Sequence, residues 1–227
     1  MKGYSIIDNQ TIEPHIKFLR INPTDIKLTL KNVLDSLMSM SWLYNFDKEY
    51  LVDGYKERCE QSINHISKNI LKQNDSAVTS SSGEYVVSEL ARTSVVDTYS
   101  YLDVPIADLI KKQVVGNPGF DFYTLNSKKN ILFGEAKYIS RQSGHLKALE
   151  QSYKFYLQKQ HITEIPDIQN FFCEESLTNC NKGEIGFMVA FSAKKTETKD
   201  FIEIIKKNKD YQELRKFKEV ILIAVNI

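Results

Sequence analysis

The sequence contains few cysteines and no long apolar run. Its 227 residues include three cysteines, Cys59, Cys173 and Cys180, which are far apart and form no Cys-x-x-Cys pair. This pattern argues against a disulfide framework and against a structural zinc site. No segment approaches the roughly 18 apolar residues of a membrane-spanning helix, and the first residues lack the apolar core of a secretory signal. We therefore expect a cytoplasmic protein with no membrane contact.

The sequence also lacks the motifs of several enzyme classes. It has no Gly-x-x-x-x-Gly-Lys motif to cradle the phosphates of a nucleotide, and no Gly-x-Ser-x-Gly elbow for serine hydrolysis. The four histidines, His15, His65, His145 and His161, do not have the spacing of metal ligands. ATP hydrolysis, serine hydrolysis and a histidine-bound metal are therefore not expected.

An excess of positive charge is missing as well. The chain has 30 basic and 29 acidic residues, for a formal net charge of +1. Proteins that bind long nucleic acids unaided usually carry a basic excess, because neutralising phosphates supplies much of the affinity. If this chain acts on nucleic acid, it must use a local patch or rely on a partner.

The chain does contain enough apolar residues for a sizeable core. Hydrophobic residues make up 42% and charged residues 26%, which are ordinary values for a globular protein.

Residues 1–35 combine short apolar stretches with two prolines and predict strands or extended segments. Helical spacing follows, and the polar stretch 73–83 predicts a loop. We interpret residues 1–80 as an N-terminal α+β elaboration that could serve as a partner interface, and 81–227 as the main domain.

The main domain is predicted to alternate helices with strands. A helix is expected from Gly83 to Tyr99, after which the pattern predicts strands at 119–125 and 130–138, a helix at 143–160, a strand at 184–193, a helix at 198–208 and a strand at 217–227. Such alternation is typical of an α/β fold, here a mixed central sheet flanked by helices.

Three charged side chains next to apolar runs form the candidate site. Asp121 lies in the first of two neighbouring predicted strands, and Glu135 and Lys137 end the second. Residues two apart on a strand share a face, so Glu135 and Lys137 project together. If the neighbouring strand brings Asp121 beside Glu135, the two carboxylates repel unless a proton or cation lies between them, and Mg²⁺ prefers such oxygen ligands. Lys137 would then orient or help to deprotonate a metal-bound water. The alternative is an exposed hairpin with an ordinary Glu–Lys surface pair.

These residues resemble the defining motif of the PD-(D/E)xK nuclease superfamily. PGFD would supply the first acid, Asp121, and GEAK would supply Glu135 and Lys137. The resemblance covers roughly residues 83–227. It implies a restriction-endonuclease-like fold and hydrolysis of phosphodiester bonds in DNA with Mg²⁺, or Mn²⁺ in its place.

The family resemblance also implies an acid on the helix before the sheet. Glu84 and Glu89 are candidates, and Glu84 is preferred because it shares a helical face with Val87 and Ala91. The implied catalytic set is then Asp121, Glu135, Lys137 and Glu84, and the implied metal ligands are Asp121, Glu135, Glu84 and the backbone carbonyl of Ala136. Members often carry a polar residue on the following helix, for which Gln142 and Gln151 are candidates. Lys194 and Lys195 follow a predicted strand and are candidates for contact with the DNA backbone.

More narrowly, GE, PGFD and ILFGEAKY followed by a long helix resemble HamA, the nuclease subunit of Hachiman-type antiphage defence. This resemblance implies an effector that works with a helicase partner. The near-neutral net charge suits a chain whose partner supplies most of the grip on DNA. Two alternatives remain open: a stand-alone restriction-type endonuclease, and a non-catalytic subunit that keeps a nuclease-like fold for interaction.

Overall fold

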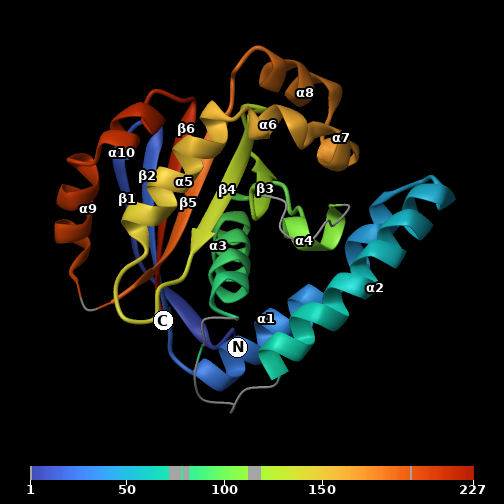
Figure 1. Ribbon diagram of the computed structural model, residues 1–227, viewed down its shortest axis with the longest axis horizontal. Coiled ribbons are helices and arrows are strands. Elements are labelled where there is room, and N and C mark those ends of the chain that lie inside the picture. Colours follow the sequence, from blue (N-terminus) through green and yellow to red (C-terminus); the bar gives the residue numbers. More distant parts are fainter. Residues whose placement is uncertain (1, 72–77, 79–81, 112–118, 195) are drawn as a thin grey trace.

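A six-stranded mixed sheet forms the centre of the protein, with its strands in the order β1-β2-β6-β5-β4-β3 (Figure 1). The structure is a computed structural model that describes residues 2–71, 78, 82–111, 119–194 and 196–227. The strands are β1 (Tyr4–Glu13), β2 (Ile16–Pro23), β3 (Phe122–Leu125), β4 (Ile131–Lys137), β5 (Gly186–Ala193) and β6 (Glu219–Asn226). The prediction of an α/β fold with a mixed sheet flanked by helices is confirmed.

Parallel strands occupy the middle of the sheet. β4, β5 and β6 run in the same direction, with Glu135 paired to Val189 and Val189 to Leu222. β5 is buried along its whole length, as expected for a strand covered on both faces. Because these strands are parallel, their carboxyl ends meet at one edge of the sheet, where β4 ends at Lys137. In α/β proteins this edge is the usual place for a ligand site.

The N-terminal residues extend the same sheet. β1 and β2 form an antiparallel hairpin, and β2 pairs in parallel with β6. The stretch predicted as an N-terminal elaboration therefore adds two strands to the central sheet before the helices α1 (Ile26–Met38) and α2 (Glu49–Leu71). The prediction that residues 26–35 are extended is wrong. Asp25 caps α1 there by accepting a hydrogen bond from the Leu28 amide.

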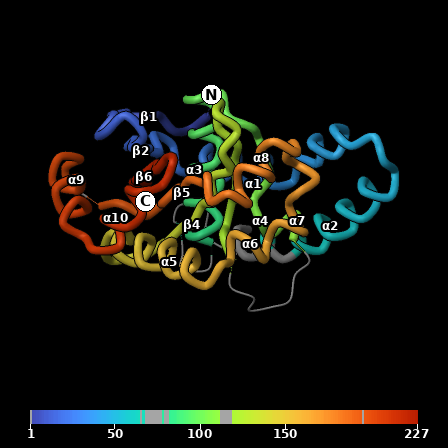
Figure 2. Tube along the Cα trace, turned by 90° about the horizontal axis from the view of Figure 1, so that it is seen from above, coloured from blue at the N-terminus to red at the C-terminus, as the bar shows by residue number. Residues whose placement is uncertain are grey.

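Helices cover both faces of the sheet (Figure 2). α5 (His145–Leu157) packs on β4 and β5, where Tyr156 meets the ring of Phe187. α3 (Gly83–Tyr99) lies against the opposite face of the same strands. The remaining helices are α4 (Ala107–Ile110), α6 (Gln160–Thr163), α7 (Ile165–Ile168), α8 (Glu174–Asn181), α9 (Thr198–Lys206) and α10 (Lys209–Leu214), with 3-10 turns η1 (Ser41–Asn45) and η2 (Gln169–Phe171).

Aromatic side chains join the N-terminal helices to the rest of the protein. Trp42 and Phe46 pack with Tyr55 of α2 and with Phe171 of η2, at ring-centroid distances of 5.2 to 6.2 Å. Tyr50, at the start of α2, is exposed. This cluster connects residues that are more than a hundred positions apart in the sequence.

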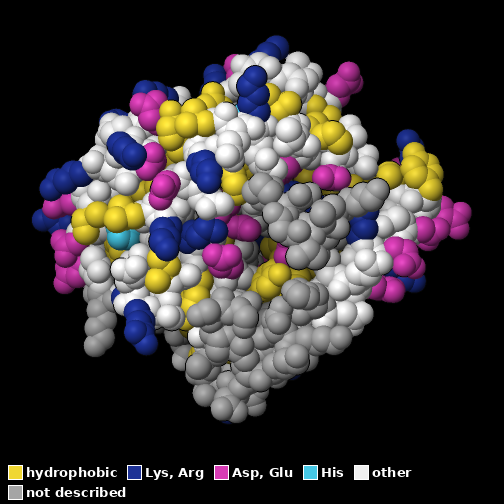
Figure 3. Space-filling model, viewed as in Figure 1, with side chains coloured by type: hydrophobic (Ala, Val, Ile, Leu, Met, Phe, Trp, Pro, Cys, Tyr) yellow, Lys and Arg dark blue, Asp and Glu magenta, His cyan; other side chains and the backbone are white. Residues whose placement is uncertain are grey.

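On the described part of the face in Figure 3, neither positive nor negative side chains form a large patch of one charge. Lysine and arginine side chains there are interspersed with aspartate and glutamate. Among the described helices, none combines the length and apolar character needed to cross a bilayer. The predicted loop at 73–83 lies mostly outside the described residues.

Candidate active site

The site forms where β3 stops and β4 continues. β3 and β4 pair as far as Phe122 opposite Gly134, and the Asp121 amide still donates to the Gly134 carbonyl at 2.8 Å. One further step of this register places Asp121 opposite Glu135. Beyond this point the Asp121 side chain replaces a strand neighbour, because its Oδ2 accepts a hydrogen bond from the Ala136 amide at 2.7 Å. Asp121 is therefore held at the edge of β4 by both its backbone and its carboxylate.

Glu135 and Lys137 form an ion pair in a buried position. Lys137 Nζ lies 2.7 Å from Glu135 Oε1, which agrees with the prediction that the two side chains share a face of β4. Glu135 is 1% exposed, whereas the Lys137 side chain keeps 19% of its accessible surface. Such burial does not fit an exposed hairpin with an ordinary surface pair.

α3 brings Glu84 to this site. Gly83 lies against the ring of Tyr138, directly after β4, so the first turn of α3 sits beside the carboxyl end of that strand. Glu84 Oε1 is 3.4 Å from Lys137 Nζ, and the Glu84 side chain is half exposed. Glu135 and Glu84 therefore both contact the Lys137 ammonium, with Glu84 at the solvent side, and Asp121 is close enough to raise the pKa of that lysine.

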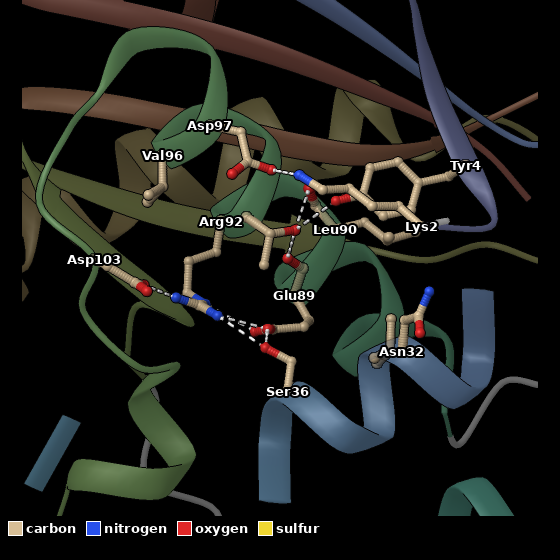
Figure 4. A pocket seen from close by; sticks show the side chains of 12 residues that line it. Lys2, Tyr4, Asn32, Ser36, Glu89, Leu90, Arg92, Val96, Asp97 and Asp103 are labelled. Atoms are coloured by element: carbon tan, nitrogen blue, oxygen red, sulfur yellow. Dashed lines mark hydrogen bonds and ion pairs between the residues drawn. The ribbon is translucent and has the colours of Figure 1, made fainter. Parts of the chain in front are cut away.

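Glu89, the other candidate on α3, belongs to a different environment. Its carboxylate is buried and accepts two hydrogen bonds from Arg92, from Nε at 2.8 Å and from Nη2 at 2.6 Å. Ser36 of α1 donates to the same carboxylate at 2.5 Å. This network lines a cavity of about 340 Å³ between the start of the chain, α1 and α3 (Figure 4). Glu89 is thus fully engaged away from Asp121 and Glu135.

The ionised forms of both carboxylates at the edge of β4 are disfavoured. Burial raises the pKa of Asp121 from 3.8 to about 7, although Lys137 and the Ala136 amide act in the opposite direction. Burial and the nearby Asp121 carboxylate raise the pKa of Glu135 well above its ordinary value. Burial acts to lower the pKa of Lys137, but the carboxylates of Glu135 and Asp121 outweigh it and raise that pKa. A positive charge between the acids would relieve this repulsion.

One oxygen of Glu135 is suited to a cation. Within the described residues, Glu135 Oε2 is buried and has no hydrogen-bond partner. Leaving a carboxylate oxygen in this state is costly unless a ligand satisfies it. Across the same residues, no group of three or more His, Cys, Asp and Glu side chains is arranged to hold a metal ion. Mg²⁺ requires less, since it is commonly held by one or two carboxylates together with water and substrate phosphates. Asp121 and Glu135 fit that requirement.

Two further residues, which were not predicted from the sequence, adjoin the site. Asp108 of α4 lies near enough to Asp121 to raise the pKa of its carboxyl. The Tyr85 side chain hydrogen-bonds to Asp108, and its pKa is raised by burial and by the surrounding acids. Asp108 is brought here because the neighbouring Ala107 amide donates to the Asp121 carbonyl at 2.7 Å. No local motif in the sequence marks Asp108 or Tyr85.

Of the remaining predicted residues, the structure describes Lys194, Gln142 and Gln151. Lys194 follows β5, where its ammonium is 2.5 Å from the Ile227 carbonyl and 5.9 Å from the Tyr138 ring centroid. Gln142 is exposed in the loop before α5, and Gln151 is half-buried on that helix. Lys195 lies outside the described residues.

No protein-family model matches this chain, and neither the curated proteins nor the solved structures include a significant match, so its function has to be inferred from its own residues.

Proposed function

We propose that this chain is a metal-dependent nuclease that hydrolyses phosphodiester bonds in DNA. The observation that carries the proposal is the meeting of Asp121, Glu135 and Lys137 at the carboxyl edge of a parallel sheet, with Glu135 Oε2 buried and unpartnered among the described residues. A purely structural ion pair gains nothing from an unsatisfied oxygen, because the desolvation cost is not recovered. A cation-binding role accounts for that oxygen.

Each residue has a distinct role in this proposal. Asp121 and Glu135 would hold Mg²⁺ or Mn²⁺, supported by Glu84 and the backbone carbonyl of Ala136. When bound, the ion would lower the pKa of a water molecule and offset charge on the phosphate. Lys137 stays protonated at neutral pH because neighbouring carboxylates raise its pKa. It therefore donates a hydrogen bond to the attacking water or to a phosphate oxygen, and is not suited to remove a proton.

The fold and the biological setting are part of the same proposal. The hairpin β3-β4, followed by α5 and the parallel strand β5, is compatible with a restriction-endonuclease-like arrangement. We further propose that the chain is the effector of an antiphage defence complex with a helicase partner. The net charge of +1 and the mixed charges of Figure 3 support this, because such a surface has little electrostatic affinity for DNA by itself.

The direct test is DNA cleavage by the purified chain, with and without the candidate helicase and ATP. Supercoiled plasmid, single-stranded DNA and RNA are incubated with Mg²⁺, with Mn²⁺ or with a chelator. We expect cation-dependent cutting of DNA that is abolished in Glu135→Gln and in Lys137→Met. The matched control is the exposed pair of Lys216 and Glu213 on and beside α10, 2.7 Å apart, whose variants Glu213→Gln and Lys216→Met should cut normally.

Cleavage at the wild-type rate by Glu135→Gln would remove the basis of the nuclease assignment. Loss of cleavage in Glu213→Gln as well would show that the assay reports folding or a contaminant. If the wild-type chain binds its partner but cuts no substrate under any condition, the non-catalytic interaction subunit becomes the better description.

A further inference from the structure

A further buried ion pair lies next to the candidate site. Glu164, between α6 and α7, is 3% exposed, and its Oε1 is 2.8 Å from Lys111 Nζ. The same oxygen accepts from Gln160 Nε2 at 3.0 Å, and Oε2 accepts from the Tyr123 hydroxyl at 2.5 Å. A buried carboxylate with this many donors is fully satisfied, in contrast to Glu135.

This pair holds the backbone of the residue before Asp121. The Phe120 amide donates to Glu164 Oε1 at 3.0 Å, and the Phe120 carbonyl accepts from Lys111 Nζ at 2.9 Å. Phe120 precedes β3, so side chains supply the hydrogen bonds that a strand neighbour would otherwise make. The fit is close, since a Cβ on Gly119 would lie 2.4 Å from Glu164 Oε1 and 2.5 Å from Lys111 Nζ. Only glycine is tolerated there without displacing the pair.

We infer that Glu164, acting with Lys111, is a positioning residue that sets the location of the Asp121 carboxylate. Asp121 is covalently attached to the clamped residue, and its Oδ2 reaches the Ala136 amide only if that backbone is in place. Functional groups need placement within about 0.5 Å, which supporting hydrogen bonds of this kind provide. The inference rests on the proposed function for its catalytic consequence, but the positioning itself can be measured without catalysis.

A buried glutamate–lysine pair comparable to Glu164 and Lys111 lies away from the candidate site. Glu219, at the start of β6, is 5% exposed and accepts from Lys17 at 2.6 Å, from the Tyr101 hydroxyl at 2.8 Å and from Asn126 at 2.7 Å. Like Glu164, it combines a lysine, a tyrosine and an amide around one buried carboxylate. It lies at the amino end of the parallel strands, opposite the edge that holds Lys137. Glu219→Gln is therefore the control for a merely structural effect.

The experiment compares Glu164→Gln with Glu219→Gln by NMR and by kinetics. The first readout is the Ala136 amide resonance and its hydrogen exchange, which report the hydrogen bond to Asp121. We expect Glu164→Gln to shift this resonance and accelerate its exchange, and Glu219→Gln to leave both unchanged. The second readout is DNA cleavage, in which Glu164→Gln should lower kcat roughly 10- to 100-fold and raise the Mg²⁺ concentration for half-activation, with an unchanged KM for DNA.

The outcomes separate the positioning role from the nuclease assignment. An unchanged Ala136 amide in Glu164→Gln overturns the inference, as does an equal disturbance of that amide by Glu219→Gln. If the wild-type chain cuts no DNA, the nuclease proposal fails, while the amide result still decides whether Glu164 positions Asp121. If Glu164→Gln does not fold, Lys111→Met is measured against Lys17→Met by the same two readouts, with the same expectations.

Discussion

Replacing Asp121 with asparagine should make the metal-free protein more stable above neutral pH. The folded protein binds a proton at Asp121 up to about pH 7, whereas the unfolded chain releases it near 3.8. The free energy of unfolding of the wild type therefore falls as the pH rises from about 4 to about 7, and this contribution is level above that range. Asparagine cannot ionise, and its side-chain oxygen can still accept from the Ala136 amide.

The size of the effect follows from the pKa of Asp121. A rise of about 3 pH units corresponds to roughly 4 kcal/mol of destabilisation once the carboxylate is ionised in the folded protein. Because Asp121 keeps partial solvent contact and titrates together with Glu135, we expect about half of this, on the order of 2 kcal/mol. For a chain of this length such a gain raises the melting temperature by roughly 4–8 °C.

The assay is urea unfolding in a chelating buffer at pH 4, 5.5, 7 and 8. The advantage of Asp121→Asn should be absent at pH 4, grow through the intermediate values and be complete at pH 8. The control is Asp97→Asn, which alters an exposed ion pair with Lys2 and should change the free energy of unfolding by less than about 1 kcal/mol at every pH. If Asp121→Asn is less stable than the wild type at pH 8, the carboxylate supports the fold and the reasoning that leads to a cation site is refuted.

Three further predictions test neighbouring parts of the structure. Magnesium at about 100 times its dissociation constant should stabilise the folded wild type by about 2.7 kcal/mol, measured by thermal melting, and should not stabilise Asp121→Asn. Equal stabilisation of both proteins would favour a non-catalytic subunit. Glu89→Gln removes one of the two carboxylates that pair with the buried guanidinium of Arg92, the other being Asp103, and should lower the free energy of unfolding by roughly 1–3 kcal/mol. The folded variant should keep its cleavage rate, and loss of cleavage in folded protein would point to Glu89 as the α3 acid. Gly134→Ala would place a Cβ 2.6 Å from the Phe122 ring and should lower the free energy of unfolding in urea by about 1–3 kcal/mol. An unchanged free energy of unfolding would contradict this prediction.

Local patterns in the sequence predicted most elements of the second half of the chain. Apolar runs and helical spacing located β4, α5 and β5 to within a few residues, because each of these elements is specified by its own periodicity. The first strand of the same unit is shorter than predicted, since β3 begins at Phe122 and the preceding residues are held by side chains. Only the start of α1 was missed: helical spacing was recognised from Lys31 onward, whereas the helix begins at Ile26, where the apolar pattern is ambiguous and Asp25 provides the cap.

By itself, the sequence determined that Glu135 and Lys137 share a face of one strand, because side chains alternate along extended backbone. Only the tertiary structure decided which other groups join them. It placed Glu84, which the sequence already favoured, beside Lys137, brought Asp108 near Asp121, and placed Glu164 on the Phe120 amide from 44 residues away. Such contacts depend on how helices and strands pack against one another, and no short-range period of the chain encodes them.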